Sequence, residues 1–273
     1  MRFSGFKVLL VVSVLSAVTS VLGRELEIIG ASELVGEIQV IEARHEDTFI
    51  KIARHYNLGY RELVQANPGV NPWLPGEGTD VVLPTRFVLP YAPRRGIVIN
   101  LPELRLYYFP EDNPDSVITH PISIGRMDWG TPLGVSHIQS KALKPTWYPP
   151  ESIRKEYELD GRPLARVVPP GPDNPLGNHA LRLSLPGYLI HGTNKPSGVG
   201  MRVTHGCIRM FPEDIEALFS RVEIGTPVYI VNQPYKIGWV EDGFYLEAHR
   251  PLDEELSDGW TMTALTLAYV LAT

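Results

Sequence analysis

The chain has 273 residues, of which 44% are hydrophobic and 21% charged, a globular composition that argues against long disordered segments. Its 25 lysines and arginines against 31 aspartates and glutamates give a net charge of −6, which disfavours a nucleic-acid partner because phosphate backbones bind basic surfaces. The single cysteine, Cys207, excludes an internal disulfide.

The first segment, residues 1–23, is predicted to be a cleavable signal peptide. Two cations, Arg2 and Lys7, precede an apolar run from Val8 to Val18, and small residues follow up to Gly23. The apolar run is shorter than the roughly 20 residues that a membrane-spanning helix needs. We therefore expect an exported protein that has no transmembrane helix once the signal is removed.

Residues 38–84 predict a small module with the order strand, helix, helix, strand. Asp47-Thr48 is typical of a helix cap, and the apolar side chains after it recur at the spacing of one helix face. A second short helix is expected over Leu58–Ala66, and Val81–Pro84 closes the module as a strand. We therefore expect a compact βααβ unit in front of the main body.

From residue 96 onward, short runs alternate apolar and polar side chains, as β-strands do. Ile97–Ile99 and Leu104–Phe109 predict a hairpin. Further strands are expected over residues 117–124, 135–138, 180–185, 188–191 and 228–231. With 24 glycines and 25 prolines in the chain, the pattern favours a mainly β body, sandwich-like or barrel-like, over residues 96–232.

Three other segments complete the organisation. Residues 86–95 contain prolines and paired arginines and are predicted to be a short linker. Residues 147–178 lose all alternation and are rich in proline, which is typical of a lid or substrate loop, with one helix over 152–157. A C-terminal extension, residues 233–273, begins with a predicted hairpin over 236–251.

The residues around the single cysteine carry the strongest chemical signal. Cys207 follows His205 by two positions, and His191 ends a predicted strand upstream. A thiol with a pKa of about 8.5 needs a base or a positively charged setting to react at neutral pH. A histidine supplies the base, and the helix predicted to begin at Pro212 would favour a thiolate through its positive end. Gly206 lets the backbone approach a reacting carbonyl, so that a nearby N–H can stabilise an oxyanion.

Two other interpretations of Cys207 stay open at this point. A lone cysteine often fills an apolar core, although its polar neighbours here disfavour that role. Cysteine and histidine are also the usual zinc ligands, so His191, His205 and His179 could join Cys207 in a zinc site. Their spacing fits no short zinc motif, which favours catalysis over metal binding.

The segment from Thr204 to Arg209, Thr-His-Gly-Cys-Ile-Arg, with His191-Gly192 upstream, resembles the signature of the L,D-transpeptidase catalytic domain, the YkuD type. The resemblance extends over residues 96–232. It implies that Cys207 is the nucleophile and His191 its base, oriented by the backbone carbonyl of Gly192. The other expected site residues are His205 as a supporting histidine, Gly206 and Thr204 for orientation and the oxyanion, Arg209 as a substrate or scaffold contact, and the pair Trp147 and Tyr148 in a substrate groove.

Residues 38–84 resemble a LysM module. The resemblance implies binding of N-acetylglucosamine-containing glycans through two loops, around Asp47–Phe49 and Asn67–Asn71, with Asp47, Thr48 and Asn67 as glycan-binding residues. Signal peptide, LysM module and catalytic domain, in that order, resemble the periplasmic enzymes that attach an outer-membrane lipoprotein to peptidoglycan. The resemblance therefore implies a periplasmic location and peptidoglycan as partner.

The implied reaction is acyl transfer from a tetrapeptide stem of peptidoglycan. The cysteine would be acylated, and an amine would resolve the thioester: a lysine of an outer-membrane lipoprotein or the diaminopimelate of another stem. With water as acceptor the same chemistry would make the protein a hydrolase. No metal or organic cofactor is needed. The alternative from a different class is a peptidoglycan-binding structural protein without catalysis.

Overall fold

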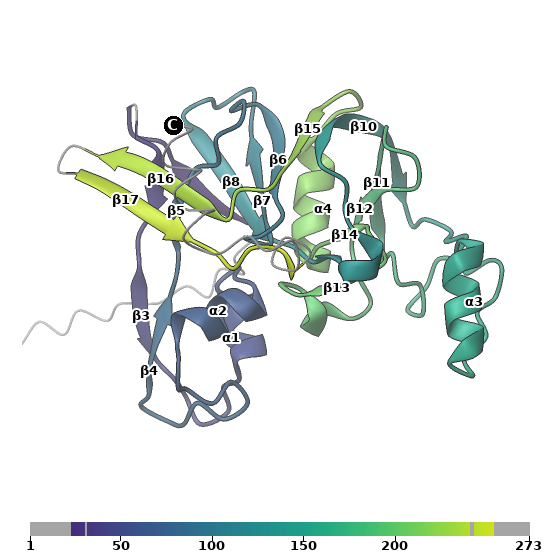
Figure 1. The fold of residues 1–273 in the computed structure, drawn as a ribbon, viewed down its shortest axis with the longest axis horizontal. Helices are drawn as coiled ribbons and strands as arrows, with labels where there is room; N and C mark the ends of the chain where they lie inside the picture. Colours follow the sequence, from purple (N-terminus) through teal and green to yellow (C-terminus); the bar gives the residue numbers. More distant parts are fainter. Residues whose placement is uncertain (1–22, 31, 241–242, 254–273) are drawn as a thin grey trace, which may run out of the picture.

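The structure, a computed structural model, describes residues 23–30, 32–240 and 243–253 (Figure 1). The predicted signal peptide, except Gly23, and the end of the C-terminal extension lie outside the described residues. Among the described residues, no helix has the length and apolar character needed to cross a bilayer.

The body is built on one nine-stranded sheet with the order β1-β8-β7-β6-β15-β10-β11-β12-β14. These strands are β1 (Arg24–Glu27), β6 (Gly96–Asn100), β7 (Arg105–Phe109), β8 (Ser116–Pro121), β10 (Gly134–Leu143), β11 (His179–Leu183), β12 (Leu189–His191), β14 (Ile208–Arg209) and β15 (Pro227–Val231). The first part of β10 pairs with β15 and its second part with β11, with an irregular register between Ile138 and Ser140. The sheet curls at this strand. The mainly β prediction is confirmed.

The period-two pattern of the strands is used on both faces of the sheet. Ile97 and Ile99 of β6 belong to a core that includes Leu218 of helix α4 (Pro212–Arg221). Val98, between them, belongs to a second core with Leu63 of the small module. Alternate side chains along one strand therefore hold the two parts of the protein together.

The small module has the predicted order. It comprises β3 (Gln39–Glu42), α1 (Phe49–His55), α2 (Tyr60–Ala66) and β4 (Asp80–Leu83), with β3 and β4 paired antiparallel. Thr48 caps α1, because its side-chain oxygen accepts a hydrogen bond from the N–H of Lys51 at 3.3 Å. The unit ends with β4 at Leu83, within the first third of the chain.

The module is packed against the body and is not tethered by a free linker. The linker predicted over residues 86–95 is wrong in its first part, because β5 (Arg86–Val88) pairs with β2 (Leu34–Gly36). Asn57 donates from its side chain to both carboxylate oxygens of the buried Asp214, at 2.8 and 2.9 Å. The two backbones also meet closely: the N–H of Arg61 donates to the carbonyl of Gly200 at 3.4 Å.

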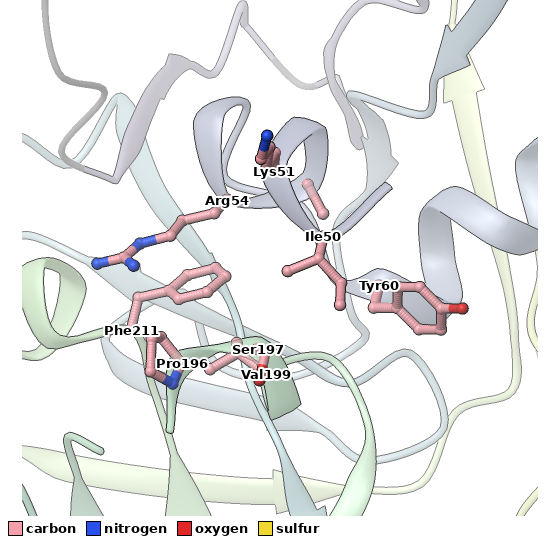
Figure 2. Close-up of a pocket in the computed structure, with 9 residues that line it drawn as sticks. Ile50, Lys51, Arg54, Tyr60, Pro196, Ser197, Val199 and Phe211 are labelled. Carbon is pink, nitrogen blue, oxygen red and sulfur yellow. The ribbon is translucent and has the colours of Figure 1, made fainter. Parts of the chain in front are cut away.

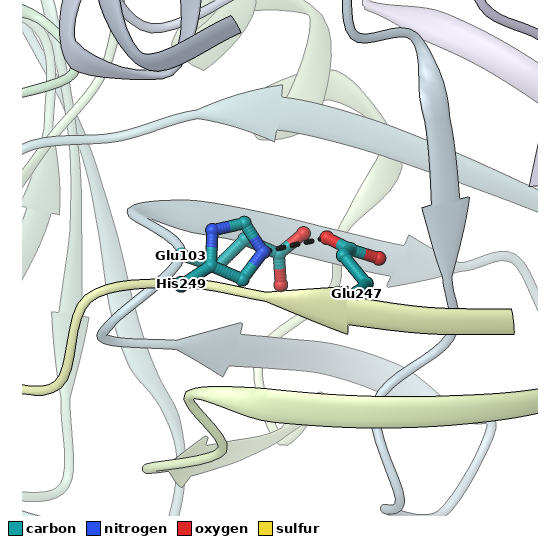
Figure 3. A group of neighbouring side chains, drawn as sticks. All are labelled: Glu103, Glu247 and His249. Atoms are coloured by element: carbon teal, nitrogen blue, oxygen red, sulfur yellow. Dashed lines mark hydrogen bonds and ion pairs between the residues drawn. The ribbon is translucent and has the colours of Figure 1, made fainter. Parts of the chain in front are cut away.

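The C-terminal hairpin, β16 (Tyr235–Val240) with β17 (Gly243–Ala248), is present as predicted and is anchored by a buried polar cluster. Lys236 is fully buried, and its Nζ lies 2.8 Å from Glu103 and 3.1 Å from Glu247. His249 contacts Glu247 at 2.6 Å (Figure 3). Glu103, Glu247 and His249 are close enough to share a cation, and the ammonium group of Lys236 already neutralises the two carboxylates.

Five further elements complete the described part of the fold. They are β9 (Ile124–Gly125), η1 (Met127–Trp129), α3 (Glu151–Leu159), η2 (Pro196–Gly198) and β13 (Arg202–Thr204). Helix α3 corresponds to the helix predicted over 152–157, and it projects from the body at the end opposite to β16 and β17 (Figure 1). It is the main regular element of the proline-rich segment 147–178.

Candidate active site

The single cysteine lies in a tight loop between β13 and β14. Gly206 has a φ of +98°, a left-handed conformation that favours glycine, and a Cβ there would lie 3.0 Å from the ring of Tyr188. The hydroxyl of Thr204 donates to the carbonyl of Cys207 at 2.6 Å. The hydroxyl of Thr131 donates to the carbonyl of Gly206 at 2.8 Å. The carbonyls of the loop are thus held in place, and Gly206 and Thr204 shape it.

Two backbone N–H groups of this loop are available to bind a ligand oxygen. In the described part of the chain, those of Gly206 and Cys207 have no hydrogen-bond acceptor. Free N–H groups beside a nucleophile can receive a negative oxygen that develops during acyl transfer. The oxyanion role expected of Gly206 stays a prediction.

His191 is the buried end of β12, next to the strand that follows the cysteine. Strands β12 and β14 are parallel, with Ile190 opposite Ile208 and His191 opposite Arg209. Nδ1 of His191 lies 2.7 Å from the carbonyl oxygen of Gly192. A carbonyl only accepts, so Nδ1 carries the proton and Nε2 keeps its lone pair. The contact that the family resemblance implied is present, and it fixes the tautomer of the ring.

Burial sets the charge of His191. It lowers the pKa of the imidazole to about 3, and the nearby guanidinium of Arg209 acts in the same direction. The hydrogen bond with Gly192 opposes the shift without cancelling it. The ring is therefore a neutral proton acceptor at pH 7.

The sulfur of Cys207 is half-buried against the start of β12. It lies 3.7 Å from the carbonyl oxygen of Gly187, and the N–H of Leu189 donates to it. Burial raises the pKa of the thiol, while the Leu189 N–H and the cation of Arg209 partly offset the increase. The expected resting thiolate is therefore wrong: the site holds a neutral thiol, and its proton has to be removed during the reaction.

The positive charge of Arg209 acts on both His191 and Cys207. Arg209 is the register partner of His191, and it lowers the pKa values of both His191 and Cys207. Its Nε is buried without a hydrogen-bond partner, and among the described residues no carboxylate pairs with its guanidinium. An arginine that stays charged and unpaired beside a nucleophile is available to an anionic group of a ligand.

His205 faces helix α3. Its Nε2 lies 3.1 Å from a carboxylate oxygen of Glu156, and the ring of Trp129 packs edge-on against its ring with 5.1 Å between centroids. Burial lowers the pKa of His205, and Glu156 opposes the shift. Sequence reasoning missed Glu156, because it lies 49 positions from His205 and nothing in its neighbourhood resembles a motif.

The other predicted ligand-binding residues have mixed placements. Asn67 is a correction: it is buried, its amide nitrogen donates to the carbonyls of Leu63 and Val82, and its oxygen accepts from the N–H of Val82. It therefore joins α2 to β4, and its amide is unavailable to a glycan. Asp47 is half-buried, and its carboxylate accepts from the N–H of Arg44 at 2.8 Å.

The aromatic pair predicted to line a groove lies in the segment that carries α3. The backbone of Trp147 exchanges two hydrogen bonds of 2.9 Å with Val168. Tyr148 is 69% exposed. Both remain open to solvent at least in part, and the structure records no contact between either side chain and Cys207.

A cleft of about 280 Å³ lies between the module and the body (Figure 2). Helix α1 and Tyr60 form one side, and Phe211 with the turn around η2 forms the other. Its lining is mainly apolar, with Lys51 and Arg54 at the α1 side. Arg54 is already engaged in a double hydrogen bond with Glu213. The cleft marks the seam between the two parts, and neither Cys207 nor His191 lines it.

Residues 94–230 match the family described as the L,D-transpeptidase catalytic domain, YkuD. The chain belongs to this family. It is an enzyme of the L,D-transpeptidase type, and the fold prediction made from the motif around Cys207 is confirmed.

Relatives of this L,D-transpeptidase match well beyond the catalytic domain. "Probable L,D-transpeptidase YcfS" of Escherichia coli (strain K12) is 45% identical over 242 residues, which cover 86% of this chain and 75% of that protein. "Probable L,D-transpeptidase YbiS" of the same strain is 41% identical over 242 residues, covering 86% of this chain and 78% of that protein. A solved catalytic domain of the E. faecium L,D-transpeptidase is 22% identical with a TM-score of 0.40, covering 52% of this chain and 100% of that chain.

Proposed function

We propose that this transpeptidase acylates Cys207 with a peptidoglycan tetrapeptide stem and passes the acyl group to an amine. The observation that carries the proposal is the hydrogen bond of 2.7 Å from Nδ1 of His191 to the Gly192 carbonyl. It leaves Nε2 as the proton acceptor on a strand next to the one that follows the cysteine. A neutral thiol and a neutral imidazole are a matched donor and acceptor for general-base activation.

In the proposed acylation, Nε2 of His191 takes the proton of the Cys207 thiol as the sulfur attacks the carbonyl of the residue before the terminal D-alanine. The carbonyl oxygen becomes an oxyanion, which the N–H groups of Gly206 and Cys207 receive. When the tetrahedral intermediate collapses, the C–N bond breaks and the imidazolium returns its proton to the leaving amine. D-Alanine departs and a thioester remains.

Deacylation reverses these roles. An acceptor amine attacks the thioester carbonyl, and His191 takes a proton from the nitrogen as the new C–N bond forms. The C–S bond then breaks, and the proton returns to the sulfur of Cys207. Water in place of the amine would give a hydrolase, so excluding water decides which product forms. No metal or organic cofactor takes part in the proposal.

Arg209 is proposed to bind a carboxylate of the stem. Its guanidinium is partly buried, and within the described residues it has no carboxylate partner, so a ligand carboxylate would satisfy its unpaired Nε. Tetrapeptide stems end in a carboxylate close to the bond that is cleaved. Arg209 would therefore select the stem and place its scissile carbonyl by the sulfur. Trp147 and Tyr148 remain proposed as groove residues.

The domain organisation supports a wall-bound enzyme. We propose that residues 1–23 direct export to the periplasm and that residues 38–84 form a LysM module that binds the glycan through the loops containing Asp47 and Thr48. Residues 96–232 form the catalytic domain and residues 233–273 a C-terminal extension. The favoured acceptor is a lysine of an outer-membrane lipoprotein, with the diaminopimelate of another stem as the second candidate.

The test uses the full mature chain and a carbapenem, which acylates a nucleophilic cysteine of this type. Intact-mass spectra are expected to show one adduct on the wild-type protein and none on Cys207→Ala. Purified sacculi, incubated with the protein and an outer-membrane lipoprotein, then identify the acceptor by the products. Absence of an adduct on the wild type would favour the alternative, a structural protein that binds peptidoglycan without catalysis.

A further inference from the structure

Helix α3 is attached to the body by very few side chains. Ile153 is its one buried residue. Helix α3 otherwise meets the site through two neighbouring residues, Glu156 and Tyr157, whose ring centroid lies 6.5 Å from that of His205. A helix with so little buried surface is held in place mainly by polar contacts.

Glu156 makes the contacts that matter. One carboxylate oxygen lies 2.8 Å from the guanidinium of Arg126, and the other lies 3.1 Å from Nε2 of His205. The N–H of Arg126 in turn donates to the carbonyl of Thr204 at 3.0 Å. A single side chain of α3 is therefore connected, directly to His205 and through Arg126 to Thr204, with the two residues that precede Gly206 and Cys207 in the loop.

We propose that Glu156 is a positioning residue of the transpeptidase, which clasps α3 onto the cysteine loop and holds His205 in one tautomer. The proposal rests on the proposed function, since it concerns the same site. A carboxylate that accepts from Nε2 keeps the proton of a neutral imidazole there and leaves Nδ1 as an acceptor.

The ion pair between Glu156 and Arg126 is a weak contact. The side chains of Glu156 and Arg126 are 30% and 40% exposed, and ion pairs this exposed are weak because water screens them. A weak clasp allows α3 to move away when a stem enters or a product leaves. With the clasp formed, α3 stands beside His205, two residues from Cys207, and the proposal assigns to it the role of limiting the access of water to the thioester.

The experiment compares Glu156→Gln with Glu158→Gln. Glu158 lies on the same helix, is exposed and makes no side-chain hydrogen bond among the described residues, so it is a matched control. Each full-length variant is incubated with a purified disaccharide tetrapeptide and with glycine as the amine. Mass spectrometry gives the ratio of hydrolysed to glycine-transferred product, and hydrogen–deuterium exchange reports on the backbone of 151–159.

For Glu156→Gln we expect the ratio of hydrolysis to transfer to rise roughly three- to tenfold, with faster exchange over α3 and unchanged exchange over α4. Glu158→Gln should behave as wild type. Equal ratios and equal exchange in both variants would overturn the proposal while leaving the proposed function intact. No product from the wild type would instead refute the proposed function.

The exchanged pair Arg126→Glu with Glu156→Arg separates the two roles of Glu156. It re-forms an ion pair between α3 and the body, so exchange protection of α3 should return. An arginine cannot accept the proton of His205, so the product ratio should stay high. Recovery of both readouts would overturn the part assigned to His205, because the clasp alone would then be sufficient.

Discussion

Replacing His191 by asparagine should change how the stability of the protein depends on pH. The histidine has a folded pKa of about 3, far below its ordinary value, because it is buried. The unfolded chain therefore binds a proton at this residue in a range where the folded protein does not. Stability contributed by the neutral ring is present above the ordinary pKa and is lost as the pH falls toward 3.

The magnitude follows from the size of the shift. The ordinary pKa of histidine is about 6.5. Protonation of this residue in the unfolded chain therefore lowers the free energy of unfolding by about 2.5 kcal/mol as the pH falls from about 7 to about 4.5. Asparagine retains an N–H that can donate to the Gly192 carbonyl but has no titration in this range. The variant should therefore lose about 2.5 kcal/mol less than the wild type across the same interval.

Urea unfolding at several pH values between those limits measures the effect. The carboxylates of the protein titrate in both proteins, so the difference between the two stability curves isolates residue 191. Curves that stay parallel would refute the reasoning, since they would mean that His191 is protonated as easily in the folded protein as in the unfolded one. Carbapenem acylation of His191→Asn should be lost at every pH, because the base is missing.

Three further changes test other parts of the structure. Lys236→Met leaves Glu103 and Glu247 without their buried cation and should cost about 3–5 kcal/mol in chemical denaturation, whereas Lys155→Met on the surface of α3 should leave stability nearly unchanged. Asn67→Ala should destabilise by about 1–3 kcal/mol, because three hydrogen bonds between its side chain and backbone groups are lost, and retention of glycan binding by the folded fraction would support the structural role assigned to it. Gly206→Ala forces a left-handed residue and a close contact with a ring, so it should cost about 1–2 kcal/mol and abolish acylation, and normal adduct formation would contradict the geometry of the loop.

The elements whose sequence pattern is local were predictable. The hairpin beginning at Ile97, the βααβ order of residues 38–84 and helix α4 after Pro212 all follow from periodicity and capping. Strands β1 and β5 were missed because each is short and gains its stability from a partner far along the chain, β8 in one case and β2 in the other. Pairing partners of that kind leave no mark in the local sequence.

The candidate site likewise contains features that the local sequence predicts and features that only the fold produces. The residues Cys207, His191 and Gly192 could be chosen from the sequence because the motif is specific, and the structure has the hydrogen bond between His191 and Gly192 that the resemblance implied. The charge state of the sulfur was mispredicted, because it depends on burial that only the folded chain produces. Asn67 was mispredicted as a ligand for the same reason, and Glu156 was missed because the fold alone brings it to the cysteine loop.

The direct packing of the βααβ unit on the sheet has a consequence for how the enzyme meets its substrate. A Cβ on Gly200 would lie 2.4 Å from the Cα of Gly59, and Arg105 in β7 reaches Glu62 in α2 at 2.6 Å, so the two parts are fastened at backbone and side-chain level. The span between the surface of α1 and the sulfur is therefore a constant of the molecule. If the βααβ unit binds a sugar as proposed, the sulfur of Cys207 is held at a fixed distance from that sugar. The catalytic domain would then reach only stems attached a set number of sugars away.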